Sequence, residues 1–417
     1  MAEVQNGIKG AVITIKIVGI GGGGNNVLRR LARDGFDRNQ LLAINTDVRQ
    51  LKALEEDGIP CLLIGASSTR GRGTGGNVEK AQNAAIGDKE EIAKAIAGAD
   101  LVFLTAGMGK GVGTGAAPVV AKIAKDMGIL TVGMVTLPFT HEGSRKMETA
   151  KAGVDLLRRH MDALVVVNND NIEKMPEFRR ITVGETFSLV DEVLRQSIGS
   201  IVEMIETTGV VNVDFADVKT IFTQGSTSEA IMGTSLGRTA LEAVQNAISS
   251  PLIEISVRGA RGIIVNITGN SSLPLEAVRE ANTFLCENTH PDVNNIFGLV
   301  VDEKLGNQVR ATIIATDFDP KVLLELQNQI KPIAFNGKEQ PKPSLYGDKP
   351  PVTRGILFGR QPATQEGGSG LGSGAGTGTG TGAVAQPPVQ NVNDVDVPEF
   401  MHKKNPAPLL FGRRDRN

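Results

Sequence analysis

The chain has 417 residues and a formal net charge of −2, which allows two folded domains with a tail and argues against a nucleic-acid partner. The two cysteines lie far apart and the four histidines do not cluster, which favours buried thiols in a reducing compartment and no metal site. No signal peptide precedes the first strand-like run and no apolar run reaches membrane-spanning length, so we expect a cytoplasmic protein.

Strand-like apolar runs alternate with helical patterns in the first half of the chain. This alternation predicts a parallel sheet with helices on both faces and a ligand site at the carboxyl ends of the strands. The runs lie at residues 12–20, 42–44, 61–64, 101–104, 130–135 and 164–167.

Glycine-rich segments follow three of these runs. The first glycine loop reads GGGGNN at 21–26, the second reads TRGRGTGGN at 69–77, and the third reads TAGMGKGVGTGAAP at 105–118. A glycine loop that opens a helix presents backbone N–H groups where the helix dipole favours an anion, so each loop is a candidate phosphate cradle. One such loop is a weak signal, but three after successive strands predict one shared site.

Residues 19–24 also fit the G-x-G-x-x-G fingerprint of dinucleotide-binding dehydrogenases. That fingerprint requires an acidic residue about 20 positions further on for the ribose, and the nearest candidate, Asp47, lies beyond that spacing. The other two glycine loops would have no role in such an enzyme. An NAD-binding dehydrogenase is therefore kept as an outside alternative.

A long amphipathic helix follows the alternating region. Its apolar residues step by three and four from Phe187 to Ile205, and Gly209 closes the pattern. About 20 helical residues span roughly 30 Å. Beyond this helix we expect a second, smaller α/β unit, with strands at 262–268, 296–301 and 309–316.

The C-terminal part of the chain has the composition of a linker. Residues 331–393 are rich in Pro, Gly, Gln and Thr and cannot bury enough apolar surface to fold. A Gly-Thr-Gly repeat at 377–382 has no strand or helix around it, so we reject it as a phosphate loop. The segment Leu-Phe-Gly-Arg occurs at 357–360 and again at 410–413, where both coincidence and a shared docking surface remain open.

The ordered motifs resemble those of the FtsZ family, the tubulin-related GTPases of bacterial division. The resemblance covers residues 12–318 and resumes in the peptide DVPEF at 396–400. In family order, the matching segments are GGGGNN (21–26), NTD (45–47), TRG (69–71), AGMG (106–109), GTGAAP (113–118), NVDFADV (212–218) and GARG (259–262).

The resemblance implies a tubulin-like α/β fold built around a Rossmann-type GTP-binding domain with a parallel sheet. The implied parts are the GTP-binding domain at 12–182, a central helix at 183–209, a C-terminal α/β domain with a catalytic acidic loop at 210–330, a disordered linker at 331–393, and a docking peptide with a basic extension at 394–417.

The resemblance also implies a site for GTP or GDP, with Mg²⁺ carried by the nucleotide. A carboxylate at Asp191 suits guanine, because it accepts hydrogen bonds from both the ring N–H and the exocyclic amine. The other implied nucleotide contacts are Gly22, Gly23, Gly24, Asn25, Asn26, Gly71, Gly73, Gly107, Met108, Gly109, Gly111, Gly113, Thr114, Gly115, Glu142, Lys146, Asn169 and Phe187.

Asn212, Asp214 and Asp217 form an acidic loop after the long helix, at the end opposite Phe187 and Asp191. Without the resemblance, a plain turn with capping residues would be the preferred interpretation. The resemblance implies that the loop is catalytic. However, the loop lies too far from the nucleotide site of its own chain to act there. Head-to-tail stacking would bring the loop into the site of the next subunit, and such a contact generates filaments.

Three residues of the glycine loops depart from the family pattern, and Lys146 stands where the family has Arg. The third glycine loop reads GGGTGTG in the family and GKGVGTG here, so Lys110 and Val112 are unusual, and Arg72 replaces an apolar residue in the second loop. Val112 lacks a hydroxyl that could bond phosphate, while Lys110 and Arg72 add positive charge. A filament scaffold of the same fold with weak or no GTPase activity is therefore the main alternative to an active GTPase.

The resemblance implies a head-to-tail homopolymer at the division site, the Z ring. Asp396, Val397, Pro398 and Phe400 would dock membrane-adaptor division proteins. The membrane itself would be contacted only indirectly or through the basic end of the tail.

Overall fold

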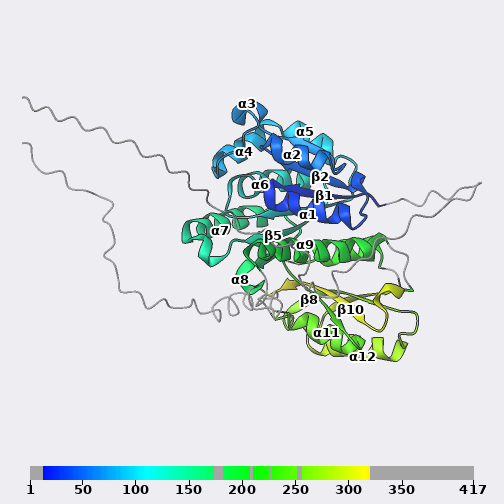
Figure 1. The fold of residues 1–417 in the computed structure, drawn as a ribbon. Coiled ribbons are helices and arrows are strands. Elements are labelled where there is room, and N and C mark those ends of the chain that lie inside the picture. The colour runs from blue at the N-terminus through cyan, green and yellow to red at the C-terminus, as the bar shows by residue number, and fades with distance from the viewer. Residues whose placement is uncertain are drawn as a thin grey trace, which may run out of the picture. The chain divides into compact units, whose positions relative to one another are not determined.

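The computed structural model describes residues 13–172, 182–206, 210–211, 213–225, 227–250 and 256–319 (Figure 1). Asn212 and everything from residue 320 onward, including the predicted linker and docking peptide, lie outside these ranges. The described residues contain a ten-stranded sheet with the strand order β3-β2-β1-β4-β5-β6-β7-β10-β8-β9.

The first six strands pair in parallel, as the alternating pattern predicts. Parallel strands are covered by helices on both faces, which explains their nearly continuous apolar sequences. These strands are β1 (Ile15–Ile20), β2 (Leu41–Asn45), β3 (Cys61–Leu63), β4 (Leu101–Gly107), β5 (Leu130–Leu137) and β6 (Ala163–Asn168).

Alternate residues of each strand supply two separate cores. In β1, Ile17 belongs to one buried cluster and Val18 to the other, because successive side chains of a strand point to opposite faces. The first cluster includes residues of α1 (Gly21–Arg33), α2 (Val48–Glu55), α9 (Val183–Glu206) and α10 (Phe215–Thr223). The second includes residues of α4 (Val78–Gly87), α5 (Lys89–Ile96), α6 (Gly111–Asp126) and α7 (Ser144–Arg158).

The second half of the sheet is mixed rather than parallel. Strand β7 (Glu229–Gly237) runs parallel to β6, while β10 (Val309–Phe318) lies antiparallel to both β7 and β8 (Ala260–Gly269). Strand β9 (Asn294–Val301) forms the edge of the sheet in this half, opposite the β3 edge. Helices α11 (Ala240–Ile248) and α12 (Leu275–Glu287) contribute to a third buried cluster with these strands.

Helix α9 connects the two halves through a shared core. Leu194 and Ile198 pack in the same cluster as Phe103 of β4 and Ile264 of β8. In Figure 1 the helix lies between the parallel strands and the C-terminal strands. The predicted long helix therefore packs against strands of both halves of the sheet.

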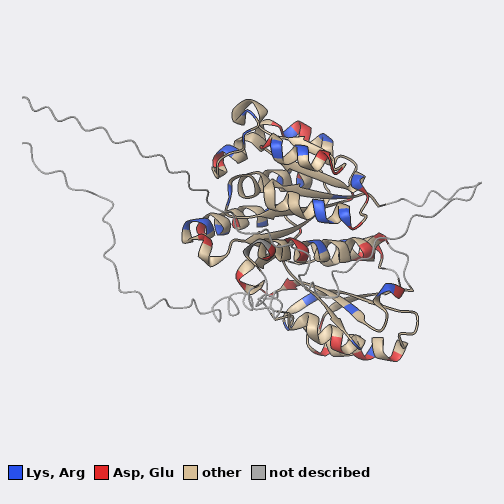
Figure 2. Cartoon of the chain, in the orientation of Figure 1, with Lys and Arg blue, Asp and Glu red and all other residues tan. Residues whose placement is uncertain are grey.

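Charged residues lie mainly on the helices and the turns, and the strands carry few of them (Figure 2). Positively and negatively charged residues occur on the same helices. Within the described ranges, no helix combines the length and the apolar character needed to cross a membrane.

Candidate nucleotide-binding site

The three glycine loops meet at one edge of the parallel sheet. The register pairs Ile20 of β1 with Ala106 of β4, so the loops that follow these strands begin side by side. A Cβ atom on Gly21 would lie 3.0 Å from the backbone nitrogen of Gly113, which leaves no room for a side chain between the first and third loops. The predicted convergence of the loops therefore has a direct steric basis.

The second loop touches the third in the same way. A Cβ atom on Gly111 would lie 2.1 Å from Oγ1 of Thr74. Gly111 also opens α6, and neither α6 nor α1 has an acidic residue in its first turn. Two uncompensated helix N-termini therefore point toward the meeting place of the loops, an arrangement that favours an anion.

A cavity of about 980 Å³ lies where the loops meet. Its size is that of a small-molecule site. The predicted nucleotide contacts that line it are Gly22, Gly23, Asn25, Asn26, Gly73, Gly107, Met108, Gly111, Gly113, Glu142, Lys146, Asn169, Phe187 and Asp191.

Five predicted contacts do not line this cavity, namely Gly24, Gly71, Gly109, Thr114 and Gly115. A Cβ atom on Gly24 would lie 2.2 Å from the Thr105 carbonyl oxygen, so this glycine allows α1 to approach β4 closely. The Thr114 hydroxyl accepts a hydrogen bond of 2.8 Å from the Gly109 amide. These residues shape the loops, whatever contacts they make with a ligand.

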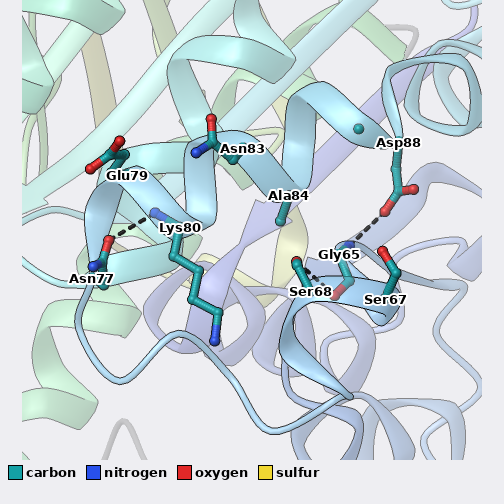
Figure 3. A pocket seen from close by; sticks show the side chains of 10 residues that line it. Gly65, Ser67, Ser68, Asn77, Glu79, Lys80, Asn83, Ala84 and Asp88 are labelled. Carbon is teal, nitrogen blue, oxygen red and sulfur yellow. Dashed lines mark hydrogen bonds between the residues drawn. The ribbon is translucent and has the colours of Figure 1, made fainter.

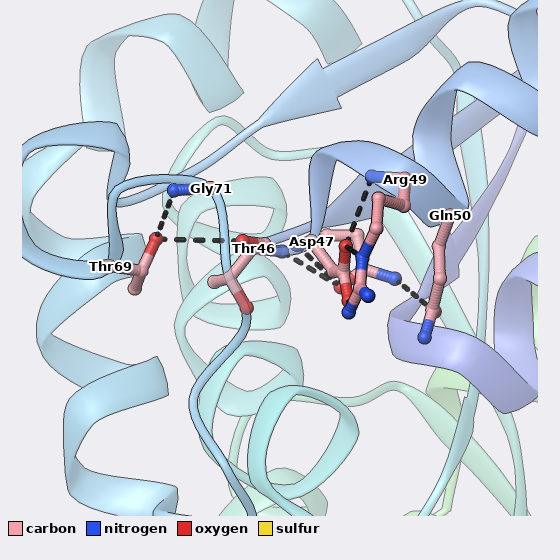
Figure 4. A network of polar contacts seen from close by, with 7 residues as sticks. Thr46, Asp47, Arg49, Gln50, Thr69 and Gly71 are labelled. Carbon is pink, nitrogen blue, oxygen red and sulfur yellow. Dashed lines mark hydrogen bonds and ion pairs between the residues drawn. The ribbon is translucent and has the colours of Figure 1, made fainter.

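The segment 45–47 lines the cavity, although the sequence analysis did not place it among the nucleotide contacts. Figure 4 shows Thr46 and Asp47 with their polar contacts. Asp47 caps α2 by accepting a hydrogen bond of 3.0 Å from the Arg49 amide, and its carboxylate pairs with the Arg49 guanidinium. The hydrogen bond from the Arg49 side chain lowers the pKa of Asp47. The Thr46 carbonyl accepts from the Gly73 amide at 3.0 Å, which holds the second glycine loop in place.

Two buried oxygen atoms of lining residues have no hydrogen-bond partner among the described residues. They are Oγ1 of Thr46, which is fully buried, and Oδ1 of Asn169, a residue that is 5% exposed. Leaving a buried polar atom unpaired costs about 1–3 kcal/mol, and a polar ligand would remove that cost. The lining therefore fits a ligand rich in hydrogen-bonding groups, as a ribonucleotide is.

An aromatic ring and a carboxylate stand together on α9 at the cavity. Phe187 is 45% exposed, and its ring meets the buried Phe139 edge-on with centroids 5.7 Å apart. Burial raises the pKa of Asp191 to about 6, while the charge of Arg30 and a hydrogen bond with Asn26 oppose that rise. A flat ring beside a hydrogen-bond-accepting carboxylate is suited to a purine with two adjacent donors.

Glu142 and Lys146, four positions apart in the chain, form an ion pair. Lys146 Nζ lies 3.3 Å from Glu142 Oε2, and the other carboxylate oxygen accepts a hydrogen bond of 3.1 Å from the Phe139 amide. Both residues line the cavity, so the ion pair forms part of its wall. Glu142 thus also holds the backbone of Phe139, whose ring meets that of Phe187.

The acidic loop stays away from the cavity. Asp214 caps α10 by accepting a hydrogen bond of 3.1 Å from the Ala216 amide, and Asp217 lies in the first turn of that helix. Both side chains are exposed and neither lines the cavity. The 24 residues of α9 extend about 36 Å, and about 29 Å of that length separates Phe187 from the C-terminal end of the helix.

A parallel sheet with converging glycine loops, followed by a long helix and a second α/β unit, defines a nucleotide-binding protein of the tubulin type. Residues 14–177 match the family model of the Tubulin/FtsZ family, GTPase domain, and residues 228–319 match that of the FtsZ family, C-terminal domain. The chain belongs to the FtsZ family, and the resemblance and tubulin-like fold expected from the sequence are confirmed.

Solved structures agree with this assignment. An FtsZ dimer from M. jannaschii is 39% identical, with a TM-score of 0.68 over 73% of this chain and 88% of that chain. CetZ2 from Haloferax volcanii, in a GTPγS-bound protofilament, is 20% identical, with a TM-score of 0.63 over 76% of this chain and 97% of that chain. CetZ1 from the same organism, a GDP-bound monomer, is 21% identical, with a TM-score of 0.63 over 76% of this chain and 98% of that chain. The two CetZ structures support the fold alone.

Proposed function

We propose that this protein binds GTP in the cavity and hydrolyses it when a second copy stacks head-to-tail on the site. The observation that carries the proposal is the separation of two sets of residues. Most of the predicted base and phosphate contacts line the cavity, whereas Asp214 and Asp217 follow α9 in the chain and do not line it. A site assembled from two subunits unites them.

The glycine loops would hold the phosphates through backbone amides at the N-termini of α1 and α6. Phe187 would stack on the base and Asp191 would accept its two donors, which selects guanine over adenine. Thr46 Oγ1 and Asn169 Oδ1, which have no partner among the described residues, would form hydrogen bonds with the nucleotide. Mg²⁺, when carried in with the nucleotide, would neutralise phosphate charge.

Hydrolysis would be completed by the incoming subunit. Asp214 and Asp217 are exposed, so their carboxylates are accessible to a neighbour's site. There they would orient a water molecule whose oxygen bonds to the γ-phosphorus, while the bond from that phosphorus to the β–γ bridging oxygen breaks. Inorganic phosphate would leave while GDP stays bound, and the lost phosphate contacts would make the GDP-bound interface weaker.

Membership of the FtsZ family supports a role in the cytoplasmic division ring. A head-to-tail contact does not close on itself, so repeated contacts produce a filament. The 39% identical FtsZ relative from M. jannaschii was solved as a dimer, which supports association between subunits. We further propose the domain bounds 12–182, 183–209 and 210–330, and docking of adaptors on residues 396–400.

Val112 favours a second candidate function, a filament scaffold with little or no GTPase activity. Its side chain lines the cavity without a hydroxyl for phosphate. A dehydrogenase receives no comparable support, because Asp47 already caps α2 and pairs with Arg49.

The test is GTP turnover per subunit measured over a range of protein concentrations. A cooperative rise above a threshold, with filaments seen by light scattering, supports the proposed GTPase. Filaments without turnover indicate the scaffold. Turnover per subunit that is independent of concentration contradicts catalysis between subunits, and tight NAD binding without GTP binding contradicts the nucleotide assignment.

A further inference from the structure

Most charged side chains around the cavity are paired with a neighbour of opposite sign. Each pair contributes little net charge to the space between the loops. The pairs are Arg49–Asp47 at 3.1 Å, Lys146–Glu142 at 3.3 Å and Arg29–Asp57 at 2.9 Å, and Asp191 lies 3.9 Å from Arg30.

Lys110 and Arg72 are the two remaining cations of the lining. Within the part of the chain that the structure describes, no carboxylate oxygen lies within 4.0 Å, the limit for an ion pair, of a side-chain nitrogen of either residue. Both residues are exposed. The lining of the cavity therefore carries two uncompensated positive charges in addition to its helix N-termini.

The two cations lie on loops that touch each other. Lys110 is the residue before the first turn of α6 and has an extended backbone, with φ −117°. Arg72 lies in the second glycine loop, two residues before Thr74, and Thr74 is the residue that Gly111 approaches. The side chains of Lys110 and Arg72 thus start from adjacent walls of the phosphate end of the cavity, whereas Phe187 and Asp191 come from α9.

We propose that Lys110 and Arg72 form a two-cation clamp for the terminal phosphate of a nucleoside triphosphate, and that the clamp replaces part of the charge neutralisation that a divalent cation supplies. This inference rests on the proposed GTP site. A terminal phosphate brings up to two negative charges and several acceptor oxygens. Lysine offers a point charge and arginine a planar fork of donors, so the two can share one phosphate.

The clamp predicts a preference for triphosphate over diphosphate that persists without a divalent cation. GDP lacks the group that the two cations would hold. When Mg²⁺ is present, the same phosphate charge is already partly neutralised, so the cations contribute less. The contribution of Lys110 and Arg72 should therefore depend on both the nucleotide and the metal.

The test is calorimetric titration of the full chain with GTP and with GDP, at protein concentrations below assembly, in EDTA and in Mg²⁺. In EDTA, Lys110→Gln and Arg72→Gln are each expected to weaken GTP binding about tenfold, or about 1.4 kcal/mol, and GDP binding much less. Lys110→Arg, which keeps the charge, is expected to retain the preference. The losses should shrink in Mg²⁺.

Lys80→Gln is the matched control. Lys80 lines a separate hollow of about 330 Å³, bounded by Gly65 and by residues of α3 (Ala66–Thr69) and α4 (Figure 3). The variant removes one positive charge near the second glycine loop but none from the cavity, so both affinities should stay unchanged.

Two results would overturn the clamp. One is a double variant, Lys110→Gln with Arg72→Gln, that binds GTP in EDTA as tightly as the unmodified chain. The other is an equal loss of GTP and GDP affinity. Absence of GTP binding by the unmodified chain, even in Mg²⁺, would instead overturn the proposed function itself.

Discussion

Arg30 and Asp191 join the two helices that frame the base pocket. The Arg30 Nε atom on α1 lies 3.9 Å from Oδ2 of Asp191 on α9, and the same guanidinium lies 3.7 Å from Glu192. Burial raises the pKa of Asp191 to about 6, and Arg30 limits that rise by stabilising the carboxylate. The proposed guanine-binding group is therefore held close to its titration point.

GTP affinity is expected to fall as the pH drops through about 6, the raised pKa of Asp191 in the free protein. Guanine requires the ionised carboxylate, so binding lowers this pKa, and the affinity decreases by up to tenfold per pH unit below it. Titration calorimetry between pH 5 and pH 8 measures this slope. Phosphate protonation also contributes near pH 6, so the slope is compared with that of Asp191→Asn.

Asp191→Asn should remove the additional slope and also change stability. The folded-state pKa of Asp191 is raised from 3.8 to about 6, so the folded state binds the proton more tightly than the unfolded state. Stability from this group is present below about pH 4 and is lost as the pH rises through 6. At pH 7 without nucleotide, the variant should be up to about 3 kcal/mol more stable in urea unfolding. A destabilised variant would contradict this account of the Asp191 environment.

Phe187→Ala is expected to weaken GTP binding by roughly 1–3 kcal/mol, the usual contribution of a base stacked on an aromatic ring. Because Phe187 is 45% exposed, the substitution should change thermal stability little. Phe187→Tyr keeps the ring and should bind normally. Leu156→Ala, at a residue that is 42% exposed on α7, controls for truncation of a surface apolar side chain. Unchanged affinity in Phe187→Ala would rule out stacking.

Asp214→Asn is expected to lower GTP turnover by about 100-fold or more while leaving GTP binding to monomers intact. Asparagine caps helices as well as aspartate does, so α10 keeps its N-cap and only the charge is lost. Asp214→Ala would add a capping loss of about 1 kcal/mol, which is why asparagine is the sharper choice.

A mixing experiment tests whether Asp214 acts on the neighbouring subunit. Asp214→Asn keeps its nucleotide site, and a variant disabled in phosphate binding, such as Gly111→Val in the third glycine loop, keeps its acidic loop, so a mixture should recover turnover at mixed interfaces only. If the mixture stays inactive although both variants enter the same filaments, or if Asp214→Asn loses GTP binding as a monomer, catalysis between subunits is wrong.

Val112→Thr is expected to raise turnover roughly fivefold, because a new hydroxyl at the phosphates is worth about 1 kcal/mol. A Cβ on Gly21 would lie 3.2 Å from the Cβ of Val112, so the residue stands beside the first glycine loop. Val112→Ala, which loosens packing without adding a hydroxyl, should not raise turnover. A gain in both variants would assign the effect to packing.

The amino-acid sequence determines the parts of this protein that depend on local preference and short periodicity. Ile17 and Val18 enter different cores simply because successive side chains of a strand point to opposite faces. The glycine loops share one edge because parallel strands end there. Both features follow from neighbouring residues, so the sequence alone predicts them.

Strand β7 shows where this reasoning stops. Its sequence mixes apolar, hydroxyl and glycine residues and has no clear alternation, so it was not predicted. Its place is secured by the antiparallel ladder with β10, from Ala230 opposite Thr316 to Gly237 opposite Val309. A partner about 80 positions further along the chain leaves no mark on local periodicity.

Only the tertiary structure decides what each glycine and each charge of the site does. Gly111 and Gly115 look alike in sequence, yet Gly111 lines the cavity, while a Cβ on Gly115 would lie 2.2 Å from the Val78 carbonyl oxygen, so this glycine packs α6 against α4. Lys146 is neutralised by Glu142, whereas Lys110 has no such partner among the described residues. The atoms that face a glycine or an ion belong to segments distant in the chain, and their positions are set by the packing of the whole domain.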